Sequence, residues 1–271
     1  MHFKRSAGVV LTLAFCLFPA FPFTAAAAIG AGGALPDVQA YASAYAAAVK
    51  ERQRLAEQGN ADAQFSLGLA HEKGELVTQD FAQAADWYRR AALQGHANAQ
   101  VNLGMLHQAG QGVAQDGAAA AGWYRKAAVQ GHAIAQFNLA LLYENGEGVK
   151  PDPQQAAEWY RQAAAQGKAA AQFNLALLLE GGQGVPQDLA AAAAWYRQAA
   201  EQGDADAQHA LGQAYESGRG VKKDLVAAAA WYRRAAQQGH GRAQAQLARL
   251  PAGIDATPEA AGVGQAWSGQ R

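Results

Sequence analysis

The sequence predicts an all-α fold, a solenoid of antiparallel helix pairs, because three features recur every 36 residues. A Gln-Gly pair ends at Gly59, Gly95, Gly131, Gly167, Gly203 and Gly239. An Ala-Gln pair follows on the same step, from Gln64 to Gln244, and a Trp-Tyr-Arg triplet begins at five positions from Trp87 to Trp231. A strict period of this length is typical of a solenoid, in which short units bury their apolar faces on one another.

The amino-acid composition indicates a core of small side chains and gives no sign of a nucleic-acid or membrane partner. The chain is 51% hydrophobic, and much of that is alanine, which favours closely approaching helices over bulky packing. Its 22 basic and 22 acidic residues give no net charge, so nothing in the balance attracts nucleic acid or an anionic membrane surface.

The single cysteine, Cys16, lies near the N-terminus. A lipoprotein would need a small residue before it, and Phe15 stands there instead.

Residues 1–28 are predicted to be a cleaved secretory signal peptide. Lys4 and Arg5 give a basic start, and Ala7 to Leu17 is an apolar run shorter than the roughly 20 residues that a spanning helix needs. The small residues from Thr24 to Ala28 offer cleavage sites, and an uncleaved anchor is the alternative. We therefore expect a periplasmic or secreted protein with no stable membrane insertion after cleavage, and without a cysteine for disulfides.

The rest of the chain divides at the repeat boundaries. Residues 29–36 form a glycine- and alanine-rich spacer, and 37–58 is an N-terminal capping helix that lacks the Trp-Tyr pair. The repeat solenoid covers 59–250, as five full units (59–94, 95–130, 131–166, 167–202 and 203–238) and a half unit.

Each unit is predicted to be two helices joined by a loop. In the first unit a helix runs from Ala61 to Lys73, and Gly74 ends it in the left-handed conformation. Asp80 is the N-cap of a second helix, from about Phe81 to Gln94. Asp116, Asp152, Asp188 and Asp224 are its counterparts.

The third unit shows a full family pattern. It reads Ala135-Gln-Phe-Asn-Leu-Ala-Leu-Leu-Tyr-Glu-Asn-Gly-Glu-Gly-Val149, followed by Asp152, Ala156-Ala157, Trp159-Tyr160 and Ala163-Ala164. Over roughly 59–250 the chain resembles the Sel1-like repeat proteins, relatives of the tetratricopeptide repeats. Departures are Leu76 for a loop glycine and Leu179 for a tyrosine. The resemblance implies a right-handed α-solenoid with 36-residue repeats, and adaptor roles in envelope assembly, signalling or host interaction.

The C-terminal tail, 251–271, is small and polar after Pro251, and we expect it to be disordered. Trp267, however, follows Trp231 by 36 residues. A degenerate second helix of a sixth unit, docked through Trp267, is therefore the alternative.

No catalytic or cofactor motif is found, and no metal site is predicted. Equivalent positions on stacked helices start about 8–10 Å apart, too far to converge on one ion. We interpret His96, His132 and His240 as helix caps, and His71 and His107 as replacements for a packing tyrosine. The Trp-Tyr pairs are interpreted as core. The arginine column from Arg89 and the glutamate column from Glu72 are interpreted as solvated ion pairs between units.

The candidate binding residues lie on the first helices, opposite the expected core. In related solenoids this side lines a concave groove. One column reads Ser66, Asn102, Asn138, Asn174 and Ala210, and a second reads Leu69, Met105, Leu141, Leu177 and Gln213. Amides beside an apolar stripe suit an extended peptide, whose backbone the amides can bond. The alternative is that the asparagines bond neighbouring helices and the leucines complete the packing.

The leading functional hypothesis is a non-enzymatic scaffold of the bacterial envelope or secreted space. It would bind a protein or peptide through the groove, without a cofactor. The second hypothesis is an enzyme that binds β-lactams or peptidoglycan fragments, as some cysteine-rich Sel1-like proteins do. The absence of cysteines from the mature chain weakens this likeness. A third is an array that self-associates end to end.

Overall fold

The structure, a computed structural model, describes residues 38–75, 77–251 and 254. The chain divides into two units, residues 1–51 and 52–271, and the boundary falls inside helix α3 (Val38–Glu57). A helix is thus present where the capping helix is predicted, and its capping role stays a prediction. The predicted signal peptide, the spacer and Trp267 lie outside the described residues.

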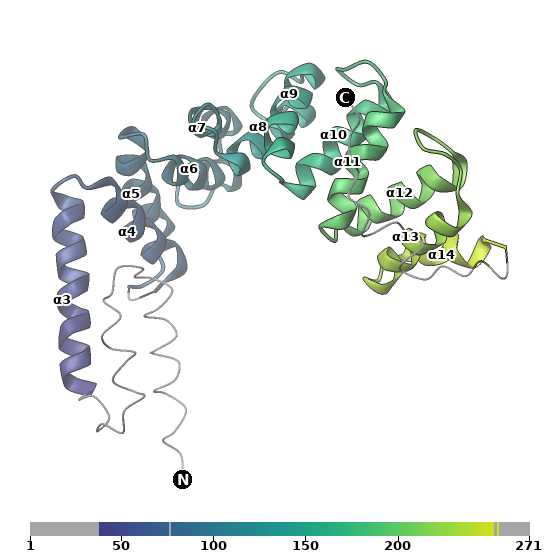
Figure 1. The fold of residues 1–271 in the computed structure, drawn as a ribbon. Helices are drawn as coiled ribbons and strands as arrows, with labels where there is room; N and C mark the ends of the chain where they lie inside the picture. Colours follow the sequence, from purple (N-terminus) through teal and green to yellow (C-terminus); the bar gives the residue numbers. More distant parts are fainter. Residues whose placement is uncertain (1–37, 76, 252–253, 255–271) are drawn as a thin grey trace, which may run out of the picture. The chain divides into compact units, whose positions relative to one another are not determined.

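The described residues of the second unit form helix pairs and contain no strand, which confirms the predicted solenoid. Figure 1 shows the pairs succeeding one another in chain order. The first helices of the pairs are α4 (Ala61–Lys73), α6 (Ala97–Ala109), α8 (Ala133–Asn145), α10 (Ala169–Gly181), α12 (Ala205–Ser217) and α14 (Gly241–Arg249). The second helices are α5 (Phe81–Leu93), α7 (Gly117–Ala128), α9 (Pro153–Ala165), α11 (Leu189–Glu201) and α13 (Leu225–Gln237).

The predicted caps are confirmed in all five units. The Asp80 carboxylate accepts hydrogen bonds from the backbone N–H groups of Ala82 and Gln83 at the start of α5. Its four counterparts accept equivalent bonds at the starts of α7, α9, α11 and α13. Gly74 ends α4 with φ +70°, a conformation that glycine adopts without a steric penalty. Local chemistry therefore sets where each helix begins and ends.

The core consists mainly of alanine, as the composition predicts. Leu103, Leu139, Leu175 and Leu211 add a buried leucine at the same position of the first helix in four units. Of the two aromatic columns, the tyrosines are buried in every unit, whereas the tryptophans are half-buried except for Trp231. Core packing is thus confirmed for the tyrosines and for Trp231, while Trp123, Trp159 and Trp195 pack against the edge of the core. The outer face of a tryptophan can receive a cation instead, since Lys126 Nζ lies 4.0 Å from the centre of the Trp123 ring.

A column of buried glutamines joins the units. Gln136 donates from Nε2 to the Ala128 carbonyl at the end of α7 (3.1 Å), and its Oε1 accepts from Gln166 Nε2 at the end of α9 (2.7 Å). One side chain thus ties together three consecutive helices, α7, α8 and α9. The same two bonds recur in every full unit; we call the set the glutamine ladder, comprising Gln64, Gln100, Gln136, Gln172 and Gln208 with Gln94, Gln130, Gln166, Gln202 and Gln238.

The loops also bind each unit to the one before it. A Cβ atom on Gly148 would lie 1.9 Å from the backbone carbonyl carbon of Gly117, the first residue of α7. Only a residue without a side chain can approach a backbone this closely. Gly112, Gly184 and Gly220 make the same approach to the first residue of a preceding second helix. Within the described residues, no helix is both long and apolar enough to cross a bilayer.

Candidate binding face on the first helices

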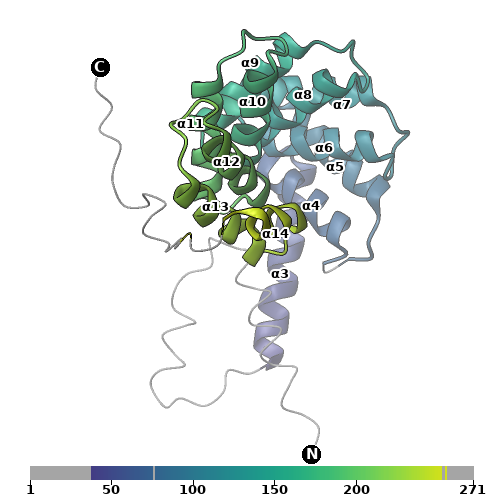
Figure 2. The same ribbon diagram turned by 90° about the vertical axis from the view of Figure 1, so that its right-hand side faces the viewer.

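The two columns predicted to bind a partner run along one side of the first helices. Within residues 52–251, Figure 2 shows α6, α8, α10 and α12 on the inner side of the curve that the pairs follow, with the second helices outside. We call the exposed or half-exposed surface of these columns the first-helix face. It comprises Ser66, Asn102, Asn138, Asn174 and Ala210, and Leu69, Met105, Leu141, Leu177 and Gln213.

The apolar column is only partly open to solvent. Met105 is 40% exposed and Leu177 is 43% exposed, so both can contact a partner. Leu69 and Leu141 are half-buried and pack against the core. The column therefore presents two separate apolar side chains, two units apart, with a flatter apolar surface between them.

The asparagine column runs beside the buried tyrosines. Asn174 Nδ2 on α10 donates to the Tyr160 hydroxyl on α9 (3.1 Å), and Asn102 and Asn138 lie beside Tyr88 and Tyr124 in the same arrangement. Ser66, which stands in their place in the first unit, donates to the Asp62 carbonyl of its own helix (2.8 Å). Asn174 thus does bond a neighbouring helix. The asparagine amides have further donor and acceptor capacity, and binding of a partner by the column stays a prediction.

The tyrosine hydroxyls connect this column to the loop side of each unit. Tyr160 Oη donates to Glu144 Oε2 (2.5 Å) while it accepts from Asn174, so the three side chains form a chain across two units. Burial raises the pKa of Tyr124 to about 12. Burial, followed by the hydrogen bond to Glu144, also raises the pKa of Tyr160. The tyrosines are therefore neutral, and the Tyr160 hydroxyl, which donates to Glu144, orients the Asn174 amide by accepting its N–H.

The histidines at the helix starts are caps, as predicted. His132 Nδ1 accepts from the Ala135 N–H at the start of α8 (3.4 Å), and His96 and His240 do the same for α6 and α14. His132 Nε2 lies 2.8 Å from Asn98 Oδ1 of the preceding unit. Burial lowers the pKa of His132. In the part of the chain that the structure describes, no group of three His, Cys, Asp or Glu side chains is placed to hold a metal ion.

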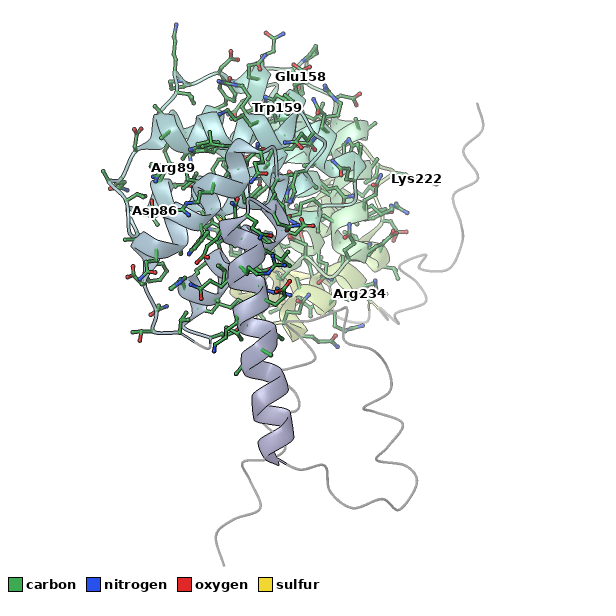
Figure 3. The ribbon with its side chains drawn as sticks, turned by 90° about the vertical axis from the view of Figure 1, so that its left-hand side faces the viewer. Asp86, Arg89, Glu158, Trp159, Lys222 and Arg234 are labelled. Carbon is green, nitrogen blue, oxygen red and sulfur yellow. The ribbon has the colours of Figure 1, made fainter. Side chains whose placement is uncertain are left out.

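Three arginines of the column, Arg89, Arg125 and Arg197, form contacts other than the predicted ion pairs between units. Arg89 pairs with Asp86 of its own helix (2.8 Å), and both are labelled in Figure 3. Arg125 donates to the Tyr143 hydroxyl of the next unit (2.7 Å), and Arg197 donates to Tyr215. The prediction was wrong for Arg125 and Arg197 because the next unit offers a tyrosine hydroxyl, rather than a carboxylate, within reach.

A cavity that the sequence reasoning missed lies at the C-terminal end of the face. Its volume is about 580 Å³, and Ala210 and Gln213, the fifth members of the two columns, line it. Arg219, Lys223 and Arg249 contribute three cationic side chains. The sequence did contain a signal for this cavity: the three cations depart from the repeat, since the corresponding positions of the other units carry no cation.

Comparisons with known proteins agree with this architecture. The family model described as Sel1 repeat matches residues 61–96, 97–132, 133–168, 169–204 and 205–240. A protective antigen of uropathogenic Escherichia coli with an SLR fold is 38% identical, with a TM-score of 0.73 over 78% of this chain and 46% of that protein. The chain thus spans about half the length of that relative. A Sel1 repeat protein from Oxalobacter formigenes is 35% identical, with a TM-score of 0.66 over 76% of this chain and 84% of that one. A search of curated proteins gave no match.

Proposed function

Because the chain belongs to the Sel1 repeat family, whose members are generally protein-interaction scaffolds, we propose that it is a non-catalytic scaffold that holds a peptide or protein on its first-helix face. The N-terminal sequence supports a location in the bacterial envelope or the secreted space.

One observation supports this proposal most directly. The two columns of the first-helix face contain no charged residue from the first unit to the fifth, although the chain is 16% charged. Met105 and Leu177 are substantially exposed on this face. A surface that combines exposed apolar side chains with amide groups is suited to a peptide backbone and its apolar side chains.

A site-specific photo-crosslinker tests the face directly. The full chain is produced in its own cells with p-benzoylphenylalanine at position 105 or 177, and the crosslinked species are compared with those from positions 93 and 129. Leu93 and Val129 are matched controls, since they are 69% and 68% exposed apolar residues near the ends of second helices. We expect one shared crosslinked protein from positions 105 and 177 that positions 93 and 129 do not give.

Charge substitution gives an independent test. Met105→Glu with Leu177→Glu should abolish capture of that protein, whereas Leu93→Glu with Val129→Glu should not, because only the first pair changes the face. Circular dichroism checks that both variants are folded. If all four crosslinker positions capture the same proteins, or if the Met105/Leu177 variant captures its partner as well as wild type, the assignment to this face is wrong.

The proposed location has its own measurement. Fractionation of cells and N-terminal sequencing of the purified chain should find it outside the cytoplasm, beginning after one of Ala26 to Ala28. A chain that begins at Met1 and stays in the cytoplasm would contradict this part of the proposal.

A further inference from the structure

The cavity at the C-terminal end of the first-helix face differs from the rest of that face in charge. It is lined by side chains from α10, α12, the loop after α12, α13 and the end of α14. Ala210 and Gln213 continue the two uncharged columns into its wall. Its volume, about 580 Å³, lies within the range of ligand pockets. The cavity is therefore the end of the face rather than a separate feature.

The three cations of the cavity occupy positions that carry no cation in the other units. The column of Arg219 reads Glu75, Gln111, Glu147 and Gln183 in the earlier units, and that of Lys223 reads Gln79, Gln115, Pro151 and Gln187. Arg249 is the sixth member of the apolar column, after Leu69, Met105, Leu141, Leu177 and Gln213. Comparison of the units thus shows that, at these three positions, a cation occurs only at the C-terminal end of the array.

Two glutamates in the cavity wall, Glu180 and Glu216, neutralise only part of the positive charge of the three cations. Arg219 pairs with Glu180 (3.0 Å), and Glu216 accepts a hydrogen bond from Tyr232 (2.6 Å). Among the residues that the structure describes, no carboxylate lies within 4.0 Å of Lys223 Nζ or the Arg249 guanidinium. Three cations against two acids give a formal charge of +1, with two exposed cations free to bind an anion.

We propose that this cavity binds the C-terminal carboxylate of the peptide held on the first-helix face, with Arg249 and Lys223 as its ligands. This inference rests on the proposed function. The uncharged columns match an uncharged peptide body, and the charge at one end matches a single negative group at the end of that peptide. Guanidinium groups bind carboxylates through two parallel hydrogen bonds, and an ammonium adds a point charge. The polarity of the bound peptide follows, with its C-terminus at α14.

Paired peptide arrays test the inference. One set of short peptides with uncharged bodies is immobilised twice, once through the N-terminus, which leaves the carboxylate free, and once through the C-terminus. The full chain is applied to both arrays, and the strongest binder is then measured in solution as the free acid and as the C-terminal amide. We expect binding mainly on the free-carboxylate array, and at least about tenfold weaker binding of the amide, since a hydrogen bond to a charged group has this effect.

Two variants connect that preference to the cavity. Arg249→Gln with Lys223→Gln should remove the difference between acid and amide. Lys222→Gln with Arg242→Gln is the matched control, because both are exposed cations near the same end and neither lines the cavity. This control should keep the preference, and its binding should weaken with added salt as in wild type.

The outcomes separate this inference from the proposed function. If peptides bind both arrays equally and Met105→Glu with Leu177→Glu abolishes the binding, the face is a binding surface and the carboxylate assignment is wrong. An acid preference that survives Arg249→Gln with Lys223→Gln also overturns it. If no peptide binds either array, this inference is wrong, and the crosslinks from positions 105 and 177 decide the proposed function separately.

Discussion

Replacing Gln136 by methionine tests how much the glutamine ladder contributes to stability. The side chain is 3% exposed, and methionine has a similar size without donors. The substitution removes bonds to the Ala128 carbonyl (3.1 Å), to Gln162 Oε1 (3.2 Å) and from Gln166 Nε2 (2.7 Å). Ala128 keeps a bond from the Gly131 N–H, and the two partner glutamines are exposed and can bond to water. The free energy of unfolding should therefore fall by the net contribution of three hydrogen bonds, less the gain from burying an apolar side chain in place of a polar one. We expect a loss of about 2 kcal/mol.

Urea unfolding of the full chain measures this loss, and hydrogen exchange of the α8 amides shows whether it is local, because a solenoid can unfold in parts. Gln154→Met is the control, since Gln154 is exposed and its side chain has no hydrogen bond in the described structure. If the free energies of unfolding of the two variants differ by less than about 0.5 kcal/mol, the ladder does not stabilise the array as argued.

Two further predictions concern single units. His132→Asn should keep the helix cap, as Asn60 does in the first unit, while it removes a titrating group. Because the folded-state pKa of His132 is lowered, wild-type stability relative to this variant should be constant above a pH of about 6.5 and fall as the pH drops through the folded pKa. Gly148→Ala should destabilise the chain by about 2–4 kcal/mol in urea, from left-handed strain and overlap with Gly117.

The His132→Asn and Gly148→Ala predictions each have an outcome that would contradict them. A His132→Asn variant whose stability follows pH in parallel with wild type would show that the histidine does not titrate between the folded and unfolded states. For Gly148, the control is Gly131→Ala, because Gly131 also has a positive φ but nothing within 4 Å of an added Cβ. Equal losses at the two glycines would mean that contact with the preceding unit has no energetic role.

The helices and their caps could be predicted because their signals are local. Asp80, Gly74 and the residues between them specify a helix end, a loop and a helix start without reference to other units. The histidine caps were predictable for the same reason, since the ring nitrogen of His132 bonds a backbone N–H three residues on. The family pattern added the way in which these pairs stack.

The contacts between units could not be predicted from the same signals. The column of Gln136 was visible, but its burial depends on the ends of two other helices, one of them 30 residues further along the chain. Similarly, the sequence did not distinguish the buried Tyr160 from the half-buried Trp159, because adjacent positions on one helix are equally apolar. The placement of Asn138 beside a tyrosine hydroxyl and of Arg249 in a cavity wall also required the packing of neighbours.

The loop glycines and the glutamine ladder have a consequence for how the length of such a chain can change. Gln136 and Gly148 each contact a group at a fixed position of the adjoining copy, so a copy in the same register that keeps the glutamine and the loop glycine makes the same contacts. A duplication or deletion of 36 residues restores every partner at its junction. A junction that is out of this register leaves one buried amide without its acceptor and sets one loop against a side chain. The genetic unit of growth or loss for this protein is therefore a whole helix pair.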